Sequence, residues 1–106
     1  MSTVSLHAEA GLPTAAAPLF PGGQLFATPA ALALLQRLGV SPFSLFARHL
    51  HGDWGDIGED DARANQEALA SGYRLLSRYD LPADNVIWII TEADRSVTTL
   101  LLPQDY

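Results

Sequence analysis

The sequence predicts an α+β domain in which about three helices pack on a three- to four-stranded, mainly antiparallel sheet. Two segments with helical apolar spacing come early, and three short segments rich in β-branched, aromatic and leucine residues come last. The breaks between these last segments are short and polar, which favours antiparallel pairing. The chain has 106 residues, of which 48% are hydrophobic, so it can bury one core and not two. Helices followed by strands are typical of an α+β architecture.

The domain boundary follows from where regular patterns begin. Residues 1–23 include several prolines and show no clear period, so we expect an extended or partly disordered tail. The domain is then expected to span residues 24–106. Its first element, Gln24–Ala27, is short enough to be an edge strand. An exposed edge there or at the last strand could pair with a second copy, which would give a homodimer.

Three helices are predicted from signals at their ends. Thr28-Pro29 supplies an N-cap followed by a proline in the first turn, and Gly39 ends that helix. Ser41-Pro42 repeats the start signal for a second helix. The third is expected from Glu59 to about Ser71, because carboxylates in a first turn interact favourably with the positive end of the helix dipole. Its body is polar, which predicts a position on the surface.

Three strands are predicted in the last third of the chain, over Tyr73–Tyr79, Val86–Thr91 and Val97–Leu102. Their residue types suit a pleated, half-buried surface. Residues 80–85 and 92–96 between them are rich in turn-forming side chains. These segments therefore predict a meander of three strands.

The charge balance of the chain limits the kinds of molecule that it can be expected to bind. Twelve acidic residues face six basic ones, all arginine, and the formal net charge is −6. This balance argues against extended contact with nucleic-acid phosphates and suits a basic protein partner. The chain has no cysteine, which excludes disulfides and thiolate metal sites, and we expect no cofactor. Because no apolar run approaches the roughly 20 residues of a membrane span and no signal-peptide pattern is present, we expect a cytoplasmic protein without membrane contact.

The most distinctive stretch runs from Arg48 to Asp61 and contains three glycines, so much of it is predicted to be a loop. It places His49 and His51 near the end of the second helix, where one is expected to face the core and the other solvent. Neither HxxxH nor HExxH spacing is present, so we expect no metal site. The negative end of the helix dipole is sufficient to account for histidines at this position.

Trp54 lies between two pairs of glycine and aspartate in this stretch. A tryptophan flanked by glycines either inserts into the core or stands out as a binding anchor, and insertion is the commoner outcome. Asp53 and Asp56 are expected to accept hydrogen bonds from backbone amides of the loop. The sequence leaves the choice between core residue and anchor open.

The turn over residues 92–96 has two interpretations. In the first, Arg95 stabilises a hairpin through an ion pair with Glu92 or another nearby acid. In the second, Arg95 forms a phosphate-handling cluster with Thr98 or Thr99 of the following strand and a histidine of the loop. There His49 or His51 would act as general acid or base, and Arg95 would stabilise the charge that develops on phosphorus.

A set of motifs spread from about residue 19 to the last residue carries a family resemblance. The motifs are Phe20–Gln24, Ala27–Pro29, Arg48-His49, Gly52–Asp56, Asn65, Trp88–Ser96, Thr98-Thr99, Leu102-Pro103 and Tyr106. In these residues the chain resembles small bacterial proteins that are found on plasmids and other mobile elements and are described only as plasmid-related. The resemblance implies a mobile-element context and no particular biochemical activity.

A second resemblance covers only the last third of the chain. Residues Arg74–Ser77, Ile87–Thr91, Arg95 and Thr98 are similar to the strand region of barnase- and RelE-like ribonucleases. That similarity implies cleavage of RNA by a general base, an arginine and a histidine. The chain departs from the pattern because its histidines precede the strands and because it contains no lysine.

Three classes of function therefore remain, and we favour the first. It is an acidic accessory protein that binds a protein partner, as an anti-defence inhibitor or a DNA mimic. Its candidate contact residues are Asp53, Trp54, Asp56, Glu59, Asp60 and Asp61. The alternative is a small toxin-like ribonuclease or phosphotransfer enzyme that uses His49 or His51, Arg95 and Thr98. The third class is a structural or regulatory protein recognised by shape.

Overall fold

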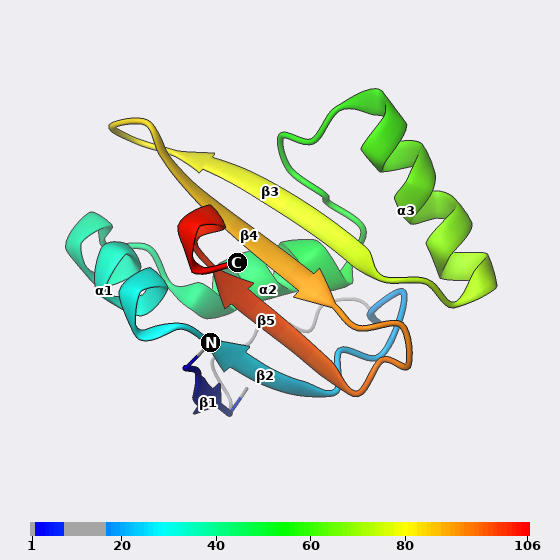
Figure 1. Ribbon diagram of the computed structural model, residues 1–106, viewed down its shortest axis with the longest axis horizontal. Helices are drawn as coiled ribbons and strands as arrows, with labels where there is room; N and C mark the ends of the chain where they lie inside the picture. The colour runs from blue at the N-terminus through cyan, green and yellow to red at the C-terminus, as the bar shows by residue number, and fades with distance from the viewer. Residues whose placement is uncertain (1, 8–16) are drawn as a thin grey trace.

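A computed structural model describes residues 2–7 and 17–106 of the chain (Figure 1). Within these residues it contains three α-helices, five strands and one short 3₁₀ helix. The helices are α1 (Pro29–Leu38), α2 (Pro42–Leu50) and α3 (Glu59–Ser71); the strands are β1 (Val4–Leu6), β2 (Gln24–Ala27), β3 (Leu75–Leu81), β4 (Asn85–Thr91) and β5 (Val97–Leu101); the 3₁₀ helix is η1 (Pro103–Asp105). The predicted α+β class is confirmed.

The sheet differs from the prediction in its number of strands and in their direction. Its order is β1-β2-β5-β4-β3, and β2 runs parallel to β5 while every other neighbour is antiparallel. It is therefore a five-stranded mixed sheet. The predicted edge strand β2 lies between β1 and β5. Neither contact has a local signal, because β1 has only three residues and β2 meets β5 about 70 residues later in the chain.

Part of the segment expected to be a tail is packed on the domain. β1 pairs with β2, the amide of Leu19 donates to the carbonyl of Leu50 at 2.8 Å, and Phe20 is buried. Residues 8–16 of the expected tail lie outside the described residues. The first described segments therefore contribute to both the sheet and the core.

The three predicted helices form where their end signals place them. The Thr28 side chain accepts a hydrogen bond from the amide of Ala31 at 3.2 Å, and Gly39 ends α1 in the left-handed conformation. α3 begins with three acidic residues and ends at a second left-handed glycine, Gly72. The predicted start and stop signals thus coincide with these boundaries, although of the three N-cap residues only Thr28 makes a side-chain capping bond.

The two faces of the sheet have different surroundings. In Figure 1, α2 crosses behind the sheet, α1 lies at its left end and α3 lies beside β3, whereas η1 is the described element in front of it. The residues that point toward the helices are largely buried, and they alternate with the residues of the front face. Those on the helix side are Leu25, Ala27, Leu75, Ser77, Tyr79, Ile87, Ile89, Thr91, Thr98 and Leu100. The main core therefore lies between the sheet and the helices.

Candidate functional site

The Gly52–Asp56 loop is bonded to the outer edge of β3. The amide of Arg78 donates to the carbonyl of Trp54 at 3.1 Å, and the amide of Asp56 donates to the carbonyl of Arg78 at 2.6 Å. The Asp56 carboxylate then accepts from the amide of Asp80 at 2.9 Å. The loop thereby supplies hydrogen-bond partners to an edge that would otherwise be free to pair with another strand.

Asn65 of α3 extends this protection along β3. Its side chain donates to the carbonyl of Leu76 at 2.7 Å and accepts from the amide of the same residue at 3.1 Å. Asn65 is buried on an otherwise polar helix, so it was not a candidate from its surroundings in the sequence. A buried amide side chain that satisfies both backbone groups of one strand residue replaces a missing neighbouring strand.

The charged and glycine positions of the loop maintain its shape. Arg48 Nε and Asp53 Oδ2 are 2.6 Å apart, and this hydrogen bond lowers the pKa of Asp53. Asp53 Oδ1 also accepts from the amide of Gly55 at 3.1 Å, as the sequence predicts for this loop. Gly55 has φ of 76°, and a Cβ at this position would overlap the carbonyl oxygen of Arg78. Arg48, Asp53 and Gly55 therefore serve the structure of the loop.

Trp54 is inserted into the core, which decides the alternative that the sequence left open. Only 7% of its surface is exposed. Its ring stacks on Phe20 with centroids 6.2 Å apart and meets the ring of His49 edge-on at 5.6 Å. Its indole nitrogen has no hydrogen-bond acceptor among the described residues. Trp54 is not available as an exposed anchor for a partner in this structure.

His49 forms the centre of a buried hydrogen-bond chain. Its Nδ1 lies 2.6 Å from Ser77 Oγ, and its Nε2 lies 2.8 Å from Thr91 Oγ1. Thr91 Oγ1 is in turn 2.8 Å from Thr98 Oγ1, which donates to the carbonyl of Gly22 at 2.7 Å. The chain joins α2, three strands and the segment before β2. The side chains of His49, Ser77, Thr91 and Thr98 are completely buried.

The direction of every proton in this chain follows from its last member. A carbonyl oxygen can only accept, so Thr98 donates to Gly22 and must accept from Thr91. Thr91 has then used its proton and accepts from Nε2–H of His49, which leaves Nδ1 to accept from Ser77. The arrangement therefore assigns a neutral His49 protonated on Nε2.

The surroundings of His49 oppose its protonation. Burial lowers its pKa from 6.5 to about 3, and the nearby Arg95 cation acts in the same direction. At neutral pH, His49 is a weak base with both ring nitrogens already bonded. The 2.6 Å contact with Ser77 has the distance of a nucleophile–base pair, but no carboxylate orients the ring and neither side chain is exposed. His49 and its partners therefore form a buried polar network in which the side-chain hydrogen-bonding groups are bonded to one another.

Arg95 binds carbonyl oxygens where the sequence suggested an ion pair. Its guanidinium donates to the carbonyls of Tyr73, Glu92, Ala93 and Ala68, at distances from 2.6 to 3.3 Å. Glu92 was the expected ion-pair partner of Arg95, but its Oε1 lies 3.4 Å from Nε of Arg74 instead. Arg95 itself has φ of 62°, and its guanidinium lies over the ring of Phe20. It therefore ties the end of α3 to the β4–β5 turn.

The structure brings together only part of the cluster proposed for the enzyme alternative. His49 and Thr98 are joined through Thr91, and Arg95 lies near enough to affect the pKa of His49. His51 is not part of this network: its Nδ1 lies 2.7 Å from the carbonyl of Ala47 within α2. As the sequence predicts, one histidine faces the core and the other is partly exposed. The arrangement gives a phosphate group no access to His49 or Thr98.

The acidic residues at the start of α3 differ from those of the loop. Glu59, Asp60 and Asp61 are exposed in its first turn. The ion pair between Asp60 and Arg63 is 3.5 Å long, and the Asp60 side chain is 98% exposed. Among the described residues, neither Glu59 nor Asp61 has an ion pair. This turn therefore presents negative charge that the fold does not use, apart from its interaction with the helix dipole.

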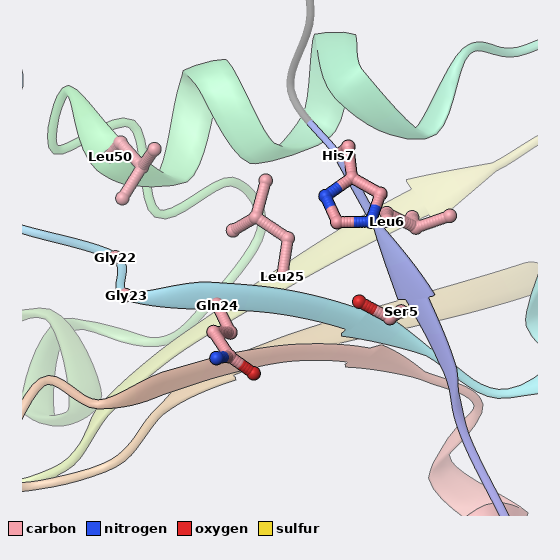
Figure 2. Close-up of a pocket in the computed structure, with 8 residues that line it drawn as sticks. All are labelled: Ser5, Leu6, His7, Gly22, Gly23, Gln24, Leu25 and Leu50. Atoms are coloured by element: carbon pink, nitrogen blue, oxygen red, sulfur yellow. The ribbon is translucent and has the colours of Figure 1, made fainter.

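A hollow of about 570 Å³ lies between β1, the start of β2 and the end of α2 (Figure 2). His7 is the titratable side chain among the residues that line it. Across residues 2–7 and 17–106, no group of three or more His, Asp or Glu side chains is arranged to hold a metal ion. No single helix in the same ranges is long and apolar enough to span a membrane, although α1 and α2 meet the length and composition criteria together as a pair bent by 106°.

Comparison with protein-family models, with curated proteins and with solved structures gave no match. The assignment of a function therefore depends on the residues of this chain. Sequence reasoning identified His49, Trp54 and Arg95 as notable, but assigned no role to Ser77, Thr91 or Asn65. For Ser77 and Thr91, the sequence signal that could have identified them is a hydroxyl side chain at an inward-facing position of an apolar strand.

Proposed function

We propose that this chain is an acidic cytoplasmic accessory protein of a mobile element that binds a basic protein partner through the first turn of α3. The observation that carries the proposal is the exposed group Glu59, Asp60 and Asp61, whose carboxylates have few partners within the fold. The loop before this turn holds it in place. Its residues Asp53, Trp54 and Asp56 fix the connection between α2 and α3 to the rest of the fold, including β3.

The distribution of arginines supports a basic partner. Four of the six form ion pairs within the chain, and Arg95 is bonded to backbone carbonyls. Only Arg37 has neither an ion pair nor a hydrogen bond within the described ranges. Few cations are thus left to contact phosphates, whereas acidic charge is available to guide association with a cationic surface.

A partner that normally handles nucleic acid fits this chemistry best. The binding surface of such a protein is basic because it neutralises phosphates, and a dense group of carboxylates can occupy the same surface. A mobile element benefits from a protein that blocks a nucleic-acid-directed defence, which is the sense in which we propose a DNA mimic or anti-defence inhibitor. The resemblance to plasmid-related proteins supplies this context.

The proposal can be tested by affinity capture from a bacterial host lysate followed by mass spectrometry. Tagged parent protein should retain a basic, nucleic-acid-binding protein, and the Asp60→Asn/Asp61→Asn variant should lose most of it. The matched control is Gln36→Lys/Gln104→Lys, which changes the net charge by the same amount at exposed positions on α1 and η1. We expect this control to retain the partner.

Two results would contradict the proposal. Equal loss of the partner from both variants would show a response to net charge alone. Capture that is unaffected by removal of the Asp60 and Asp61 charges would exclude the first turn of α3 as the binding surface. Cleavage of RNA by the parent, abolished by His49→Ala in a variant that still folds, would instead support the enzyme alternative.

A further inference from the structure

The front face of the sheet, opposite α1 and α2, is largely uncovered by the described residues (Figure 1). Two rows of side chains cross it in register. One row contains Phe26, Thr99, Ile90 and Leu76, and the other contains Leu101, Trp88 and Arg78. Phe26, Leu76 and Trp88 are only partly buried. Thr99, Ile90 and Leu101 of these rows are buried, so the accessible apolar part of this face consists of Phe26, Leu76 and Trp88.

A hollow of about 240 Å³ lies in this face, between Arg74, Leu76, Trp88, Ile90 and Tyr106. The rings of Trp88 and Tyr106 meet edge-on with centroids 5.9 Å apart, and Arg74 donates to the hydroxyl of Tyr106 at 3.0 Å. Tyr106 is 70% exposed. Tryptophan, tyrosine and arginine are the residue types most often dominant in protein–protein binding energy.

The charges on this face are paired with one another. Arg74 lies 3.4 Å from Glu92, and Arg78 lies 2.9 Å from Asp80 on the same strand. The face is thus close to neutral in a chain whose net charge is −6. A strongly basic partner has little to recognise here, and a nucleic acid would be repelled by the molecule as a whole. A second acidic molecule can approach this face with less repulsion than elsewhere.

We infer that this face joins two copies of the chain, packed face to face about a two-fold axis. Its charges are self-complementary for an axis that passes between Arg78 and Asp80, because such an axis brings Arg78 of one copy toward Asp80 of the other and repeats the contact. The molecule measures 36 by 31 Å across this face, which leaves room for the roughly 800 Å² that each partner buries in a standard interface. Pairing through the edge of β3 is blocked by the Gly52–Asp56 loop, and the other edge strand, β1, has only three residues to offer.

The first test is sedimentation of the full chain over a wide concentration range at physiological salt, where charge repulsion beyond about 8 Å is screened. The parent should change from the 11.4 kDa monomer to a species of twice that mass. Tyr106→Ala should weaken the dimer at least tenfold. Tyr73→Ala should not, because Tyr73 is similarly exposed, at 64%, but lies on the α3–β3 connection outside the hollow.

A charge exchange tests the orientation of the two copies. Arg78→Asp makes this part of the face acidic and Asp80→Arg makes it basic, so each variant alone should remain monomeric. Mixing the two should restore a dimer that contains one copy of each. Both positions are exposed, so the fold should persist, which circular dichroism can verify.

Three outcomes would overturn the inference. The first is a parent that remains at 11.4 kDa at millimolar concentration. The second is a dimer that Tyr73→Ala and Tyr106→Ala weaken equally. The third is a dimer that persists in both charge variants. Because the Asp60→Asn/Asp61→Asn variant alters a different surface, it should dimerise like the parent whatever its effect on a basic partner.

Discussion

Two adjoining parts of one acidic segment behave differently in this molecule. In Gly52–Asp56, the Asp53 carboxylate is bonded to Arg48 and to the loop backbone, Asp56 is bonded to β3, and Trp54 is packed in the core. In Glu59–Asp61, one helical turn carries three carboxylates that project into solvent. The residue types are similar, but the first part stabilises the fold and the second part is available for binding. Composition alone does not separate these two roles.

The difference follows from how many bonds each part makes within the chain. The loop satisfies backbone groups on the outer edge of β3, and a change there exposes buried polar groups or disturbs core packing. The turn at the start of α3 interacts mainly with its own helix dipole, which stabilises a protein only slightly. Substitutions in the loop should therefore reduce stability, and substitutions in the turn should change binding.

The largest effect is expected at Gly55. Gly55→Ala places a Cβ against the carbonyl of Arg78 and the ring of Tyr79 at a residue with positive φ. We expect a loss of about 4 kcal/mol or more in the free energy of unfolding, since steric overlap is added to backbone strain. Urea denaturation followed by circular dichroism measures it.

Gly58→Ala is the matched control for this substitution. A Cβ at Gly58 meets no atom within 4 Å, and its backbone does not have positive φ. The cost should be below about 1 kcal/mol, as is usual for surface positions. Equal destabilisation by the two variants would contradict the view that the loop is fixed to β3 by close approach at Gly55.

A change of pH is expected to have an intermediate effect on the free energy of unfolding, because His49 is neutral in the folded chain. The unfolded chain binds a proton at His49 below pH 6.5, whereas the folded chain does not bind it until about pH 3. The stability contributed by the neutral histidine is thus fully present above pH 6.5 and is lost as pH falls toward 3. The slope can reach roughly 1.4 kcal/mol for each pH unit in this window.

The measurement is urea denaturation of the parent and of His49→Gln between pH 7.5 and 4.5. Glutamine keeps one donor and one acceptor but does not titrate, and every other ionisable group is common to both proteins. The parent should lose stability more steeply than the variant as pH falls. Identical slopes would mean that His49 is not held neutral by its buried hydrogen bonds.

The sequence predicted most of the structure that depends on local signals. Thr28-Pro29 and Ser41-Pro42 placed two helix starts, and the carboxylates at Glu59 placed a third. β1 and the parallel contact between β2 and β5 were missed, because strand pairing between distant segments leaves no local pattern. The three-residue strand is also too short to show a period.

The candidate site was predicted less well, for the same reason. The buried chain joins His49 to Ser77 and Thr91, which are 28 and 42 residues away. Only the fold brings them together, and a histidine and a threonine considered separately suggest catalysis as readily as core packing. The insertion of Trp54 was correctly favoured, because exposed tryptophans are rare.

The smallest effect on stability is expected for Asp60→Asn/Asp61→Asn, although it should have the largest effect on the proposed partner. Both side chains are exposed, and within the fold their charge interacts only with the helix dipole and, for Asp60, with the exposed Arg63. The melting temperature should therefore fall by no more than a few degrees. A scan of parent and variant by differential scanning calorimetry checks this value. A fall as large as that of Gly55→Ala would show that the turn, like the loop, is needed for stability. The binding proposal depends on the opposite view, that the carboxylates of the turn are not needed by the fold.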